Sequence, residues 1–569
     1  DRGGFDLVLG NPPWEQLQYD PREVFAQTHP EIAAAPNMAA RNRMVAKLEV
    51  ADPTSYARHL VALRGMDGMR LFMHASGRYP LASVGRLNTA PLFLEASRSG
   101  TKQGGRVGVI VPSGIATDAF TQELFRELVE SRELASLLDF ENRRLLFQGA
   151  HSSQRFSLLT LVRAGNPSGS ASFAFFAQTV DDLHDTDRRF TLSSEDLLLL
   201  NPYTGTAPVF RTRRDAEITA AVYRGFPVLG AADGDQPWEF RVRLMFMLNE
   251  SSDLFHMQQN LDEVGGVMEG NVWESPSGSY LPLYEAKMAT IDDHRAADVV
   301  ISPTAVQRQG QPSPVTDAEH RDPGRVAVPR YWIRADDVER QSAEPSASWF
   351  LAYRDVTAST NERSVLVTIV PGGAVAATLR VVHTDVQTAA FLQGCLGSFA
   401  FDYIARQKIG GTHLTLTYFE QLPVPTEDDL AALCSGSEFI RDRVVELAYT
   451  AWDLESFAID LGVRCPPFEW RPSRRELLRA ELDAAFFHLY RIDRDDVDYI
   501  MDTFPIVRRQ DEEAHGEYRT KRLILERYDA LAEASASGTE YETVLDPPPA
   551  DPRVAHPEST RPNWAPAPS

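Results

Sequence analysis

The tetrapeptide Asn11-Pro12-Pro13-Trp14 directly follows an apolar stretch, residues 5–10, that predicts a buried strand. The side-chain oxygen of Asn11 and the carbonyl oxygen of Pro12 can both accept hydrogen bonds from a planar exocyclic amine, which aims its lone pair at an incoming methyl group. The prolines fix the backbone, and Trp14 offers a face on which a base turned out of a duplex could stack. The pattern predicts methylation of an amino group. The alternative is an Asn-Pro turn above a buried tryptophan.

The elements expected around this motif alternate between strands and helices. Strands are predicted over residues 5–10, 106–112, 135–140 and 156–162, and helices over 56–73, 92–98 and 121–132, with a turn at 100–105. This alternation indicates an α/β fold, the second half of a doubly wound sheet within residues 1–165. Because a parallel-sheet strand lies so near the first residue, we expect a partial sheet whose N-terminal strands are missing.

Three further regions are predicted beyond this sheet. Frequent Gly, Pro and Ser and short strands at 349–353 and 364–370 favour an irregular α+β domain over residues 166–425. Residues 426–535 are expected to be helical. Residues 536–569 are rich in Pro, Ala and Ser and have little to bury, so we expect a disordered tail.

Composition limits the classes of function. The 57 Lys and Arg against 80 Asp and Glu give a net charge of -23, so any nucleic-acid site has to be local. No run approaches the roughly 18 apolar residues of a membrane span, and no signal segment opens the chain. Cys395, Cys434 and Cys465 fit neither a disulfide framework nor a zinc site. A reducing cytoplasm is the expected setting.

Several segments beyond the tetrapeptide resemble the adenine-N6 methyltransferases with an Asn-Pro-Pro-aromatic motif, found in restriction-modification and phage-defence systems. These segments are Asn88–Glu95, Gly104–Ser113, Asp139–Ser153, Gly411–Leu416 and Gln421–Val424. The long form is similar to the methylases of type IIG restriction enzymes and of BREX and DISARM loci. In that family one Phe lies against the adenine of S-adenosylmethionine and another packs against the target base; Phe93 and Phe147 match them.

The resemblance implies the roles of the three large regions. Residues 1–165 would be the C-terminal half of a Rossmann-like methyltransferase domain, 166–425 a target-recognition domain, and 426–535 a helical C-terminal region. S-adenosylmethionine would be the co-substrate, with Asn11 and Phe93 contacting it, and no metal is predicted. Double-stranded DNA and other subunits of a defence system would be the partners, in the bacterial cytoplasm near the nucleoid.

The family's Gly-rich cofactor loop and its acidic ribose ligand should precede the tetrapeptide, and neither is present. No G-x-G follows an expected strand. We therefore expect this chain to be the C-terminal part of a longer protein and to be inactive by itself.

Basic and amide side chains are the expected DNA contacts. A loop that interleaves bases with Phe147 is typical of a base-flipping clamp on the phosphate backbone, and Arg and Asn further along could read base edges. The candidates are Arg143, Arg144, His151, Arg155, Lys287, His294, Arg295, Arg354, Asn361, Arg363 and His413. A solvated hairpin around one core Phe, plain surface charge and an ordinary polar turn are the alternatives.

Two acidic patterns could indicate metal chemistry. Glu285 and Lys287 form an E-x-K with Asp262 upstream, as in magnesium-dependent nucleases, but no Pro-Asp pair precedes it. The acidic run 493–498 is better explained as the start of a helix. We therefore expect no nuclease site here.

Two rival functions remain open. Methyltransferases that act on RNA bases or on a glutamine amide share the motif, although they are usually compact. A specificity subunit that binds DNA or a partner without its own catalysis is the rival from another class.

Overall fold

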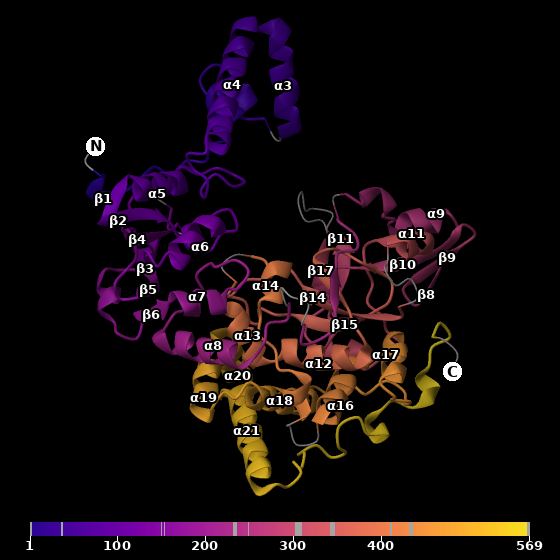
Figure 1. The fold of residues 1–569 in the computed structure, drawn as a ribbon. Helices are drawn as coiled ribbons and strands as arrows, with labels where there is room; N and C mark the ends of the chain where they lie inside the picture. Colours follow the sequence, from indigo (N-terminus) through magenta and orange to yellow (C-terminus); the bar gives the residue numbers. More distant parts are fainter. Residues whose placement is uncertain are drawn as a thin grey trace. The chain divides into compact units, whose positions relative to one another are not determined.

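The computed structural model describes residues 3–35, 38–149, 151–152, 154–230, 236–248, 250–301, 310–341, 347–409, 412–431 and 436–565. The chain divides into two compact units, Asp1–Ala220 and Ala221–Ser569, called the first and second unit below. Helix α8 (Arg213–Gly225) contains the division. Each unit combines helices with strands (Figure 1).

The first unit is built on a mixed six-stranded sheet of order β1-β2-β4-β3-β5-β6. Its strands are β1 (Phe5–Gly10), β2 (Thr101–Pro112), β3 (Leu134–Glu141), β4 (Arg155–Val162), β5 (Ser170–Ala177) and β6 (Phe190–Ser193). The pairs β1–β2 and β3–β5 are parallel, whereas β2–β4, β3–β4 and β5–β6 are antiparallel. The helices α5 (Thr89–Gly100), α6 (Gln122–Glu130) and α7 (Ser194–Leu200) complete this part.

The predicted strands and helices of residues 1–165 are confirmed, with two differences at turns. The turn expected at 100–105 is the junction where α5 runs into β2. The sheet also continues past residue 165, because β5 and β6 extend it to Ser193. The Gly- and Pro-containing segment 165–169 is therefore a turn within one sheet and not a domain linker.

Strand β1 differs from the buried strand that its apolar sequence predicts. Phe5, Leu7 and Leu9 are 67%, 58% and 79% exposed. The physical reason is that β1 lies at the sheet edge and pairs only with β2 among the described residues. A free parallel edge with apolar side chains is unusual, because such strands are normally covered on both faces.

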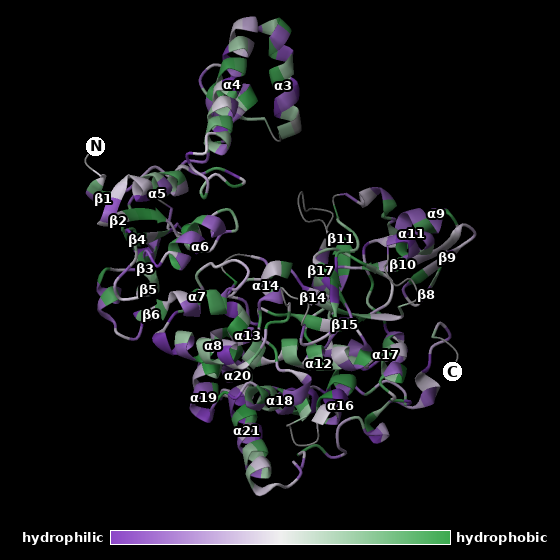
Figure 2. Ribbon diagram, viewed as in Figure 1, coloured by the Kyte–Doolittle hydropathy of each residue, from purple (hydrophilic) through white to green (hydrophobic). Residues whose placement is uncertain are grey.

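Helices between β1 and α5 form a separate small cluster. They are α1 (Pro21–Phe25), α2 (Pro30–Ala33), α3 (Met38–Ala51) and α4 (Pro53–Ala75), and α3 and α4 lie side by side as a hairpin (Figure 1). Their core is Phe25, Ile32, Val45 and Leu48. Much of α4 is nonetheless hydrophobic (Figure 2). Its Val61 and Phe72 side chains are exposed.

The described residues of the second unit form three separate sheets. One is antiparallel with order β15-β14-β17-β7, one has order β13-β10-β9-β8 with β16 added beside β10, and one is the pair β11-β12. The strands are β7 (Arg241–Arg243), β8 (Val267–Glu269), β9 (Val272–Ser275), β10 (Gly278–Tyr284), β11 (Ala297–Ile301), β12 (Gly310–Pro314), β13 (Trp332–Arg334), β14 (Trp349–Arg354), β15 (Val367–Pro371), β16 (Ala374–Val375) and β17 (Leu379–His383). Phe246, Leu283, Ile333, Val370 and Val381 belong to the core that joins them.

Helices make up most of the remainder of this unit. Those within the strand-rich part are α9 (Gln258–Glu263), α10 (Asp317–His320), α11 (Ala335–Gln341), α12 (Val386–Gly397), α13 (Phe399–Arg406) and α14 (Leu416–Glu420). The expected helical region follows as α15 (Glu427–Ala431), α16 (Gly436–Ala448), α17 (Glu455–Asp460), α18 (Pro472–Leu489), α19 (Arg494–Asp502), α20 (Pro505–His515) and α21 (Arg519–Ser537). Among the described helices, none has the length and apolar character needed to span a bilayer.

The segment after α21 differs from the expected disordered tail. Tyr541, Leu545 and Val554 are buried, and the phenol of Tyr541 donates a hydrogen bond to Glu481 at 2.9 Å. Arg561 forms an ion pair with Glu455 at 2.5 Å. The few apolar and aromatic residues among the prolines are enough to anchor residues 538–565, a pattern that composition alone does not reveal.

Candidate active site

The loop after β1 presents two hydrogen-bond acceptors. The side chain of Asn11 is exposed, and neither its amide oxygen nor the carbonyl of Pro12 has a partner among the described residues. The next carbonyl, that of Pro13, accepts a hydrogen bond from the Thr89 hydroxyl at 2.6 Å. The same hydroxyl accepts from the backbone N–H of Glu15 at 2.9 Å. The Thr89 hydroxyl thus fixes the loop on both sides of Trp14 and leaves Asn11 and Pro12 free.

Helix α5 is anchored to this loop by its first residues. The Asn88 side chain caps the helix by accepting from the Ala90 N–H at 2.9 Å, and its amide lies 3.5 Å from the Trp14 carbonyl oxygen. The Thr89 N–H donates to the Glu15 carbonyl at 2.9 Å. Phe93 follows one turn later and is 48% exposed. An aromatic face is thus available on the helix that holds the tetrapeptide.

The structure brings Trp14 and Phe147 to the same aromatic cluster. Both pack against the cluster of Phe140, Phe156 and Ala177, and the Trp14 indole N–H donates to the Ile110 carbonyl at 3.2 Å. The ring of Phe147 meets that of Phe156 edge to face, with centroids 4.8 Å apart. Trp14 and Phe147 each remain partly accessible. Two partly exposed rings beside free acceptors form a surface suited to a flat aromatic base.

Asn142 holds the loop that carries Phe147, a role that our sequence reasoning missed. Its buried side chain accepts from the Phe147 N–H at 2.9 Å and donates to the Phe147 carbonyl at 2.9 Å. It also lies 3.3 Å from the His151 carbonyl oxygen. A buried amide that satisfies both backbone groups of one residue fixes that residue firmly. An Asn two residues after a predicted strand was the available signal.

The basic residues of this loop fall into two groups. Arg143 and Arg144 are exposed; Arg143 lies 3.0 Å from Glu141, and Arg144 has no ion pair among the described residues. His151 is also exposed, whereas Ala150 and Ser153 lie outside the described residues.

Arg155 points into the fold. Its guanidinium donates to Asp139, which is fully buried, at 2.6 Å. The same carboxylate also accepts from the Ser157 hydroxyl at 3.3 Å, from the Phe176 N–H at 3.3 Å and from Ser113. Arg155 is therefore a member of a buried polar network and is not free to clamp a phosphate.

Phe176 has a left-handed backbone, with φ at 58°, which is uncommon for an aromatic residue. The guanidinium groups of Arg155 and Arg211 lie 4.7 and 4.2 Å from its ring centre. These cation–π contacts and the bond to Asp139 hold the unusual conformation in place.

In the second unit, Lys287 belongs to a compact charge cluster. It donates to the Gly310 carbonyl at 2.9 Å and lies 3.2 Å from Glu285, which Arg330 also contacts at 2.8 Å. The E-x-K pair is therefore an ion pair. Asp262 is exposed on α9, and the described residues contain no group of three or more His, Cys, Asp or Glu that could hold a metal ion.

His294 and Arg295 are buried, contrary to their prediction as DNA contacts. The His294 imidazole is 1% exposed and lies 2.9 Å from Asp453. Arg295 donates to backbone carbonyls, among them those of His320 and Thr450 at 2.8 Å each. Arg295 thus joins several segments of the chain by hydrogen bonds to their carbonyls. Because both side chains are buried, neither is available to DNA in this structure.

The remaining candidates differ in accessibility. Arg363 is 12% exposed and pairs with buried Asp402 at 2.8 Å. Asn361 is exposed and lines a cavity that Arg354 and Arg363 also line. His413 is 53% exposed and 3.5 Å from Asp355; Gly411, in the same predicted segment, lies outside the described residues.

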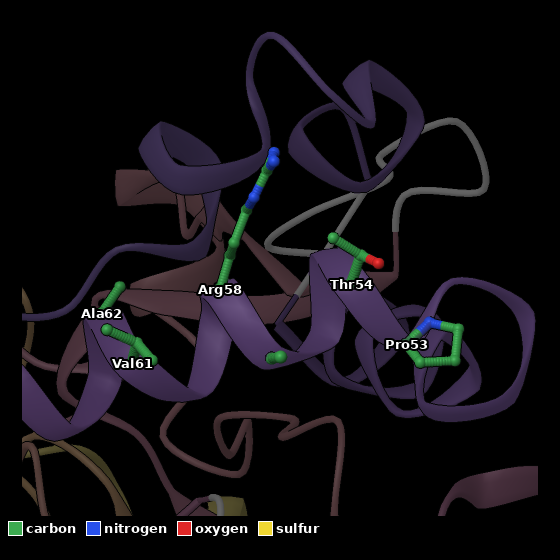
Figure 3. A pocket seen from close by; sticks show the side chains of 6 residues that line it. Pro53, Thr54, Arg58, Val61 and Ala62 are labelled. Carbon is green, nitrogen blue, oxygen red and sulfur yellow. The ribbon is translucent and has the colours of Figure 1, made fainter.

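A second, shallow hollow lies along α4 in the first unit. Pro53, Thr54, Arg58, Val61 and Ala62 line it, and Figure 3 shows the Arg58 side chain extending away from Val61 and Ala62. One charged group and short apolar side chains give it no evident chemistry.

No family model matches the chain, and no curated protein matches it. Among solved structures, the type IIL restriction-modification enzyme MmeI in complex with DNA aligns with a TM-score of 0.37 at 10% identity, over 77% of this chain and 55% of its own. The type IIG restriction endonuclease BpuSI aligns with a TM-score of 0.26 at 12% identity, over 76% and 52%. A nuclease-deletion mutant of the type ISP restriction-modification enzyme LlaGI, in complex with a DNA substrate mimic, aligns with a TM-score of 0.34 at 11% identity. The alignment covers 78% of this chain and 42% of that protein.

The chain thus spans about half the length of these proteins. At 10–12% identity, each of these alignments covers about three quarters of this chain.

Proposed function

We propose that this chain carries the base-binding part of a site-specific DNA adenine-N6 methyltransferase of a restriction-modification or phage-defence system. The observation that supports it most is the pair of unoccupied acceptors, the Asn11 amide oxygen and the Pro12 carbonyl, beside the partly exposed rings of Trp14 and Phe147. An exocyclic amine has two N–H groups, which two acceptors can hold while a stacked ring fixes the plane of the base.

The chain's own residues would orient the amine. Hydrogen bonds to Asn11 and Pro12 would draw its lone pair away from the ring and increase its nucleophilicity. The Thr89 hydroxyl would keep these acceptors in register by fixing the following carbonyl. Preorganised acceptors of this kind require no rearrangement when the bond to the methyl group forms.

S-adenosylmethionine would supply the methyl group from its sulfonium, and S-adenosylhomocysteine would leave. The chain offers one fitting element, the half-exposed ring of Phe93 on the helix that anchors the tetrapeptide. The Gly-rich loop expected from the resemblance is absent from the sequence, and we propose that an upstream part of a longer protein supplies it. The uncovered edge of β1 is consistent with such a neighbour.

Accessible basic side chains are the proposed DNA contacts. In the first unit these are Arg143, Arg144 and His151; in the second unit, His413 remains exposed and Lys287 is partly so. A few local contacts of this kind agree with a chain of net charge -23. Further subunits of the defence system remain proposed partners.

The test is transfer of labelled methyl from S-adenosylmethionine by the upstream-extended protein, with DNA, RNA and protein offered as separate acceptors. We expect label in DNA and a loss of at least about 100-fold in Asn11→Ala. Gln18→Ala, which removes another exposed amide from the same segment, should retain full activity. Label in RNA or protein would favour the compact amino-methyltransferases. DNA binding without any transfer would favour a specificity subunit.

A further inference from the structure

A cavity of about 710 Å³ lies within the second unit. It is bounded by the end of β14, residues 360–363, and parts of α12, α18, α20 and α21. Ile291, Leu366, Leu482 and Val507 give it apolar walls. This volume is in the range of small-molecule sites, which combine mostly apolar walls with a few polar groups.

Arg354 is the arginine of this cavity that has no counter-charge among the described residues. Its side chain is partly buried, forms no ion pair with any described residue, and has an Nε without a hydrogen-bond partner. The other arginines that line the cavity are all paired: Arg363 with Asp402, Arg479 with Asp292 and Arg519 with Glu476. A partly desolvated guanidinium without a counter-charge is unfavourable, and an anion that enters the cavity would relieve this cost.

Gln393 on α12 adds a fixed acceptor. Its side chain is fully buried, and its amide nitrogen donates to Asp292 at 2.6 Å and to the Val367 carbonyl at 3.1 Å. These two bonds set the orientation of the amide, so the group left over is the oxygen Oε1. No described residue donates to it. A buried unpaired carbonyl oxygen is unfavourable, and a hydrogen bond from a ligand N–H would remove this cost.

The charge and the acceptor both belong to the lining of this cavity. The backbone N–H of Arg354 donates to the Leu366 carbonyl at 2.8 Å, and Gln393 bonds to the adjacent residue, Val367. Asp483 also lines the cavity, and burial raises its pKa to about 7. Its carboxyl is therefore partly protonated near neutrality and repels an anion less than an ionised group would.

We propose that this cavity binds a small ligand of the mononucleotide class, with its phosphate on Arg354 and an amino group of its base donating to Gln393. The arrangement requires an anionic group, an N–H donor and a ring that can lie against apolar walls. A mononucleotide combines all three. Binding here is independent of methyl transfer and of the site around Asn11.

Calorimetric titration of the full chain with adenosine 5′-monophosphate, ribose 5-phosphate and adenosine tests the proposal. We expect the monophosphate to bind more tightly than either fragment. Arg354→Gln should weaken its binding about tenfold or more and leave adenosine unaffected, because only the phosphate loses its partner. Gln393→Leu should weaken adenosine and leave ribose 5-phosphate unaffected. Arg494→Gln, at an arginine outside the cavity that pairs with Asp529 at 2.7 Å, is the matched control and should change little.

Chemical denaturation separates ligand binding from a structural role. Since the Arg354 side chain has no partner to lose among the residues that the structure describes, Arg354→Gln should leave the free energy of unfolding unchanged or higher. The Arg354 result decides the case even if Gln393→Leu fails to fold. No binding at millimolar concentration, or equal binding by Arg354→Gln and the unsubstituted chain, would overturn the proposal. Weaker DNA binding by Arg354→Gln without nucleotide binding would overturn it too and identify a DNA contact.

Discussion

The two units differ in how they use the polar residues that the sequence singles out. In the first unit, Asn11 and Arg144 are exposed and have no side-chain partners among the described residues. In the second unit, His294 and Arg363 lie inside the fold with Asp453 and Asp402 as partners. A polar side chain that remains free on a well-anchored loop is available for a ligand, whereas a paired buried one stabilises the fold.

The difference also shows which sequence signals are trustworthy. The tetrapeptide directly follows a predicted strand. That strand places Asn11 to Trp14 in the loop at its end, so the sequence itself indicates their position in the fold. The second-unit candidates were chosen because Arg, His and Asn suit base edges, a criterion that contains no information on burial. Arginine is well suited to both tasks, since its planar fork binds carbonyls and carboxylates as readily as phosphates.

The largest expected effect is a loss of stability when Arg363, which we assign to stabilising the fold, is replaced. Arg363→Gln should lower the free energy of unfolding of the second unit by roughly 3 kcal/mol, because it leaves buried Asp402 with Arg406 as its remaining cation. Urea denaturation measures this loss. Arg144→Gln in the first unit is the matched control and should change stability by less than about 0.5 kcal/mol. Unchanged stability with weakened DNA binding in Arg363→Gln would break the comparison.

The next effect is a dependence of stability on pH. Burial raises the pKa of Asp483 to about 7, while Arg363 and Arg479 oppose the shift and Asp292 adds to it. The folded chain keeps a proton that the unfolded chain releases above about pH 4, so stability falls as pH rises through 7. Between pH 5 and 7.5 we expect a loss of about 2 kcal/mol, which Asp483→Asn should remove. An identical pH profile in this variant would show that Asp483 is not the group responsible.

A smaller effect is expected at Thr89, if the proposed methyl transfer occurs. Thr89→Val removes the hydroxyl that bonds the Pro13 carbonyl and the Glu15 N–H. We expect kcat to fall about tenfold with KM for DNA nearly unchanged, because the loss of one hydrogen bond displaces acceptors that act in the transition state. Thr89→Ser should restore most of the rate. A change confined to KM would contradict this positioning role.

The smallest effect concerns salt. If Arg144 contacts a DNA phosphate, Arg144→Gln should reduce the slope of log K against log salt concentration by about 0.9. Fluorescence titration of duplex DNA at several salt concentrations measures the slope. His294→Gln should leave the slope unchanged, since its imidazole is buried. Equal slopes for all three proteins would remove Arg144 from the DNA contacts.

Much of the first unit could be predicted from its sequence, because strands β1 to β4 are continuous apolar runs bounded by turns. Strands β5 and β6 were missed because the Gly- and Pro-containing turn before them is typical of a linker. The burial of Tyr541 was missed because isolated aromatics among prolines have no periodicity.

At the site, sequence reasoning supplied Asn11, Trp14 and, through the resemblance, Phe147. It did not find Thr89 or Asn142, which act through backbone groups of residues that lie next to them only in the folded chain. Such roles depend on which backbone groups folding brings beside a side chain, and the spacing of residues in the sequence does not indicate this.

Nucleoside analysis of methylated DNA tests the central claim most directly. Duplex DNA is incubated with labelled S-adenosylmethionine and the upstream-extended protein, then digested and separated. We predict label in N6-methyladenine with the unsubstituted protein and at least about 100-fold less with Asn11→Ala. Label in another nucleoside, or N6-methyladenine formed equally well by Asn11→Ala, would contradict the assignment of Asn11, Pro12, Pro13 and Trp14 as the amino-methylation site.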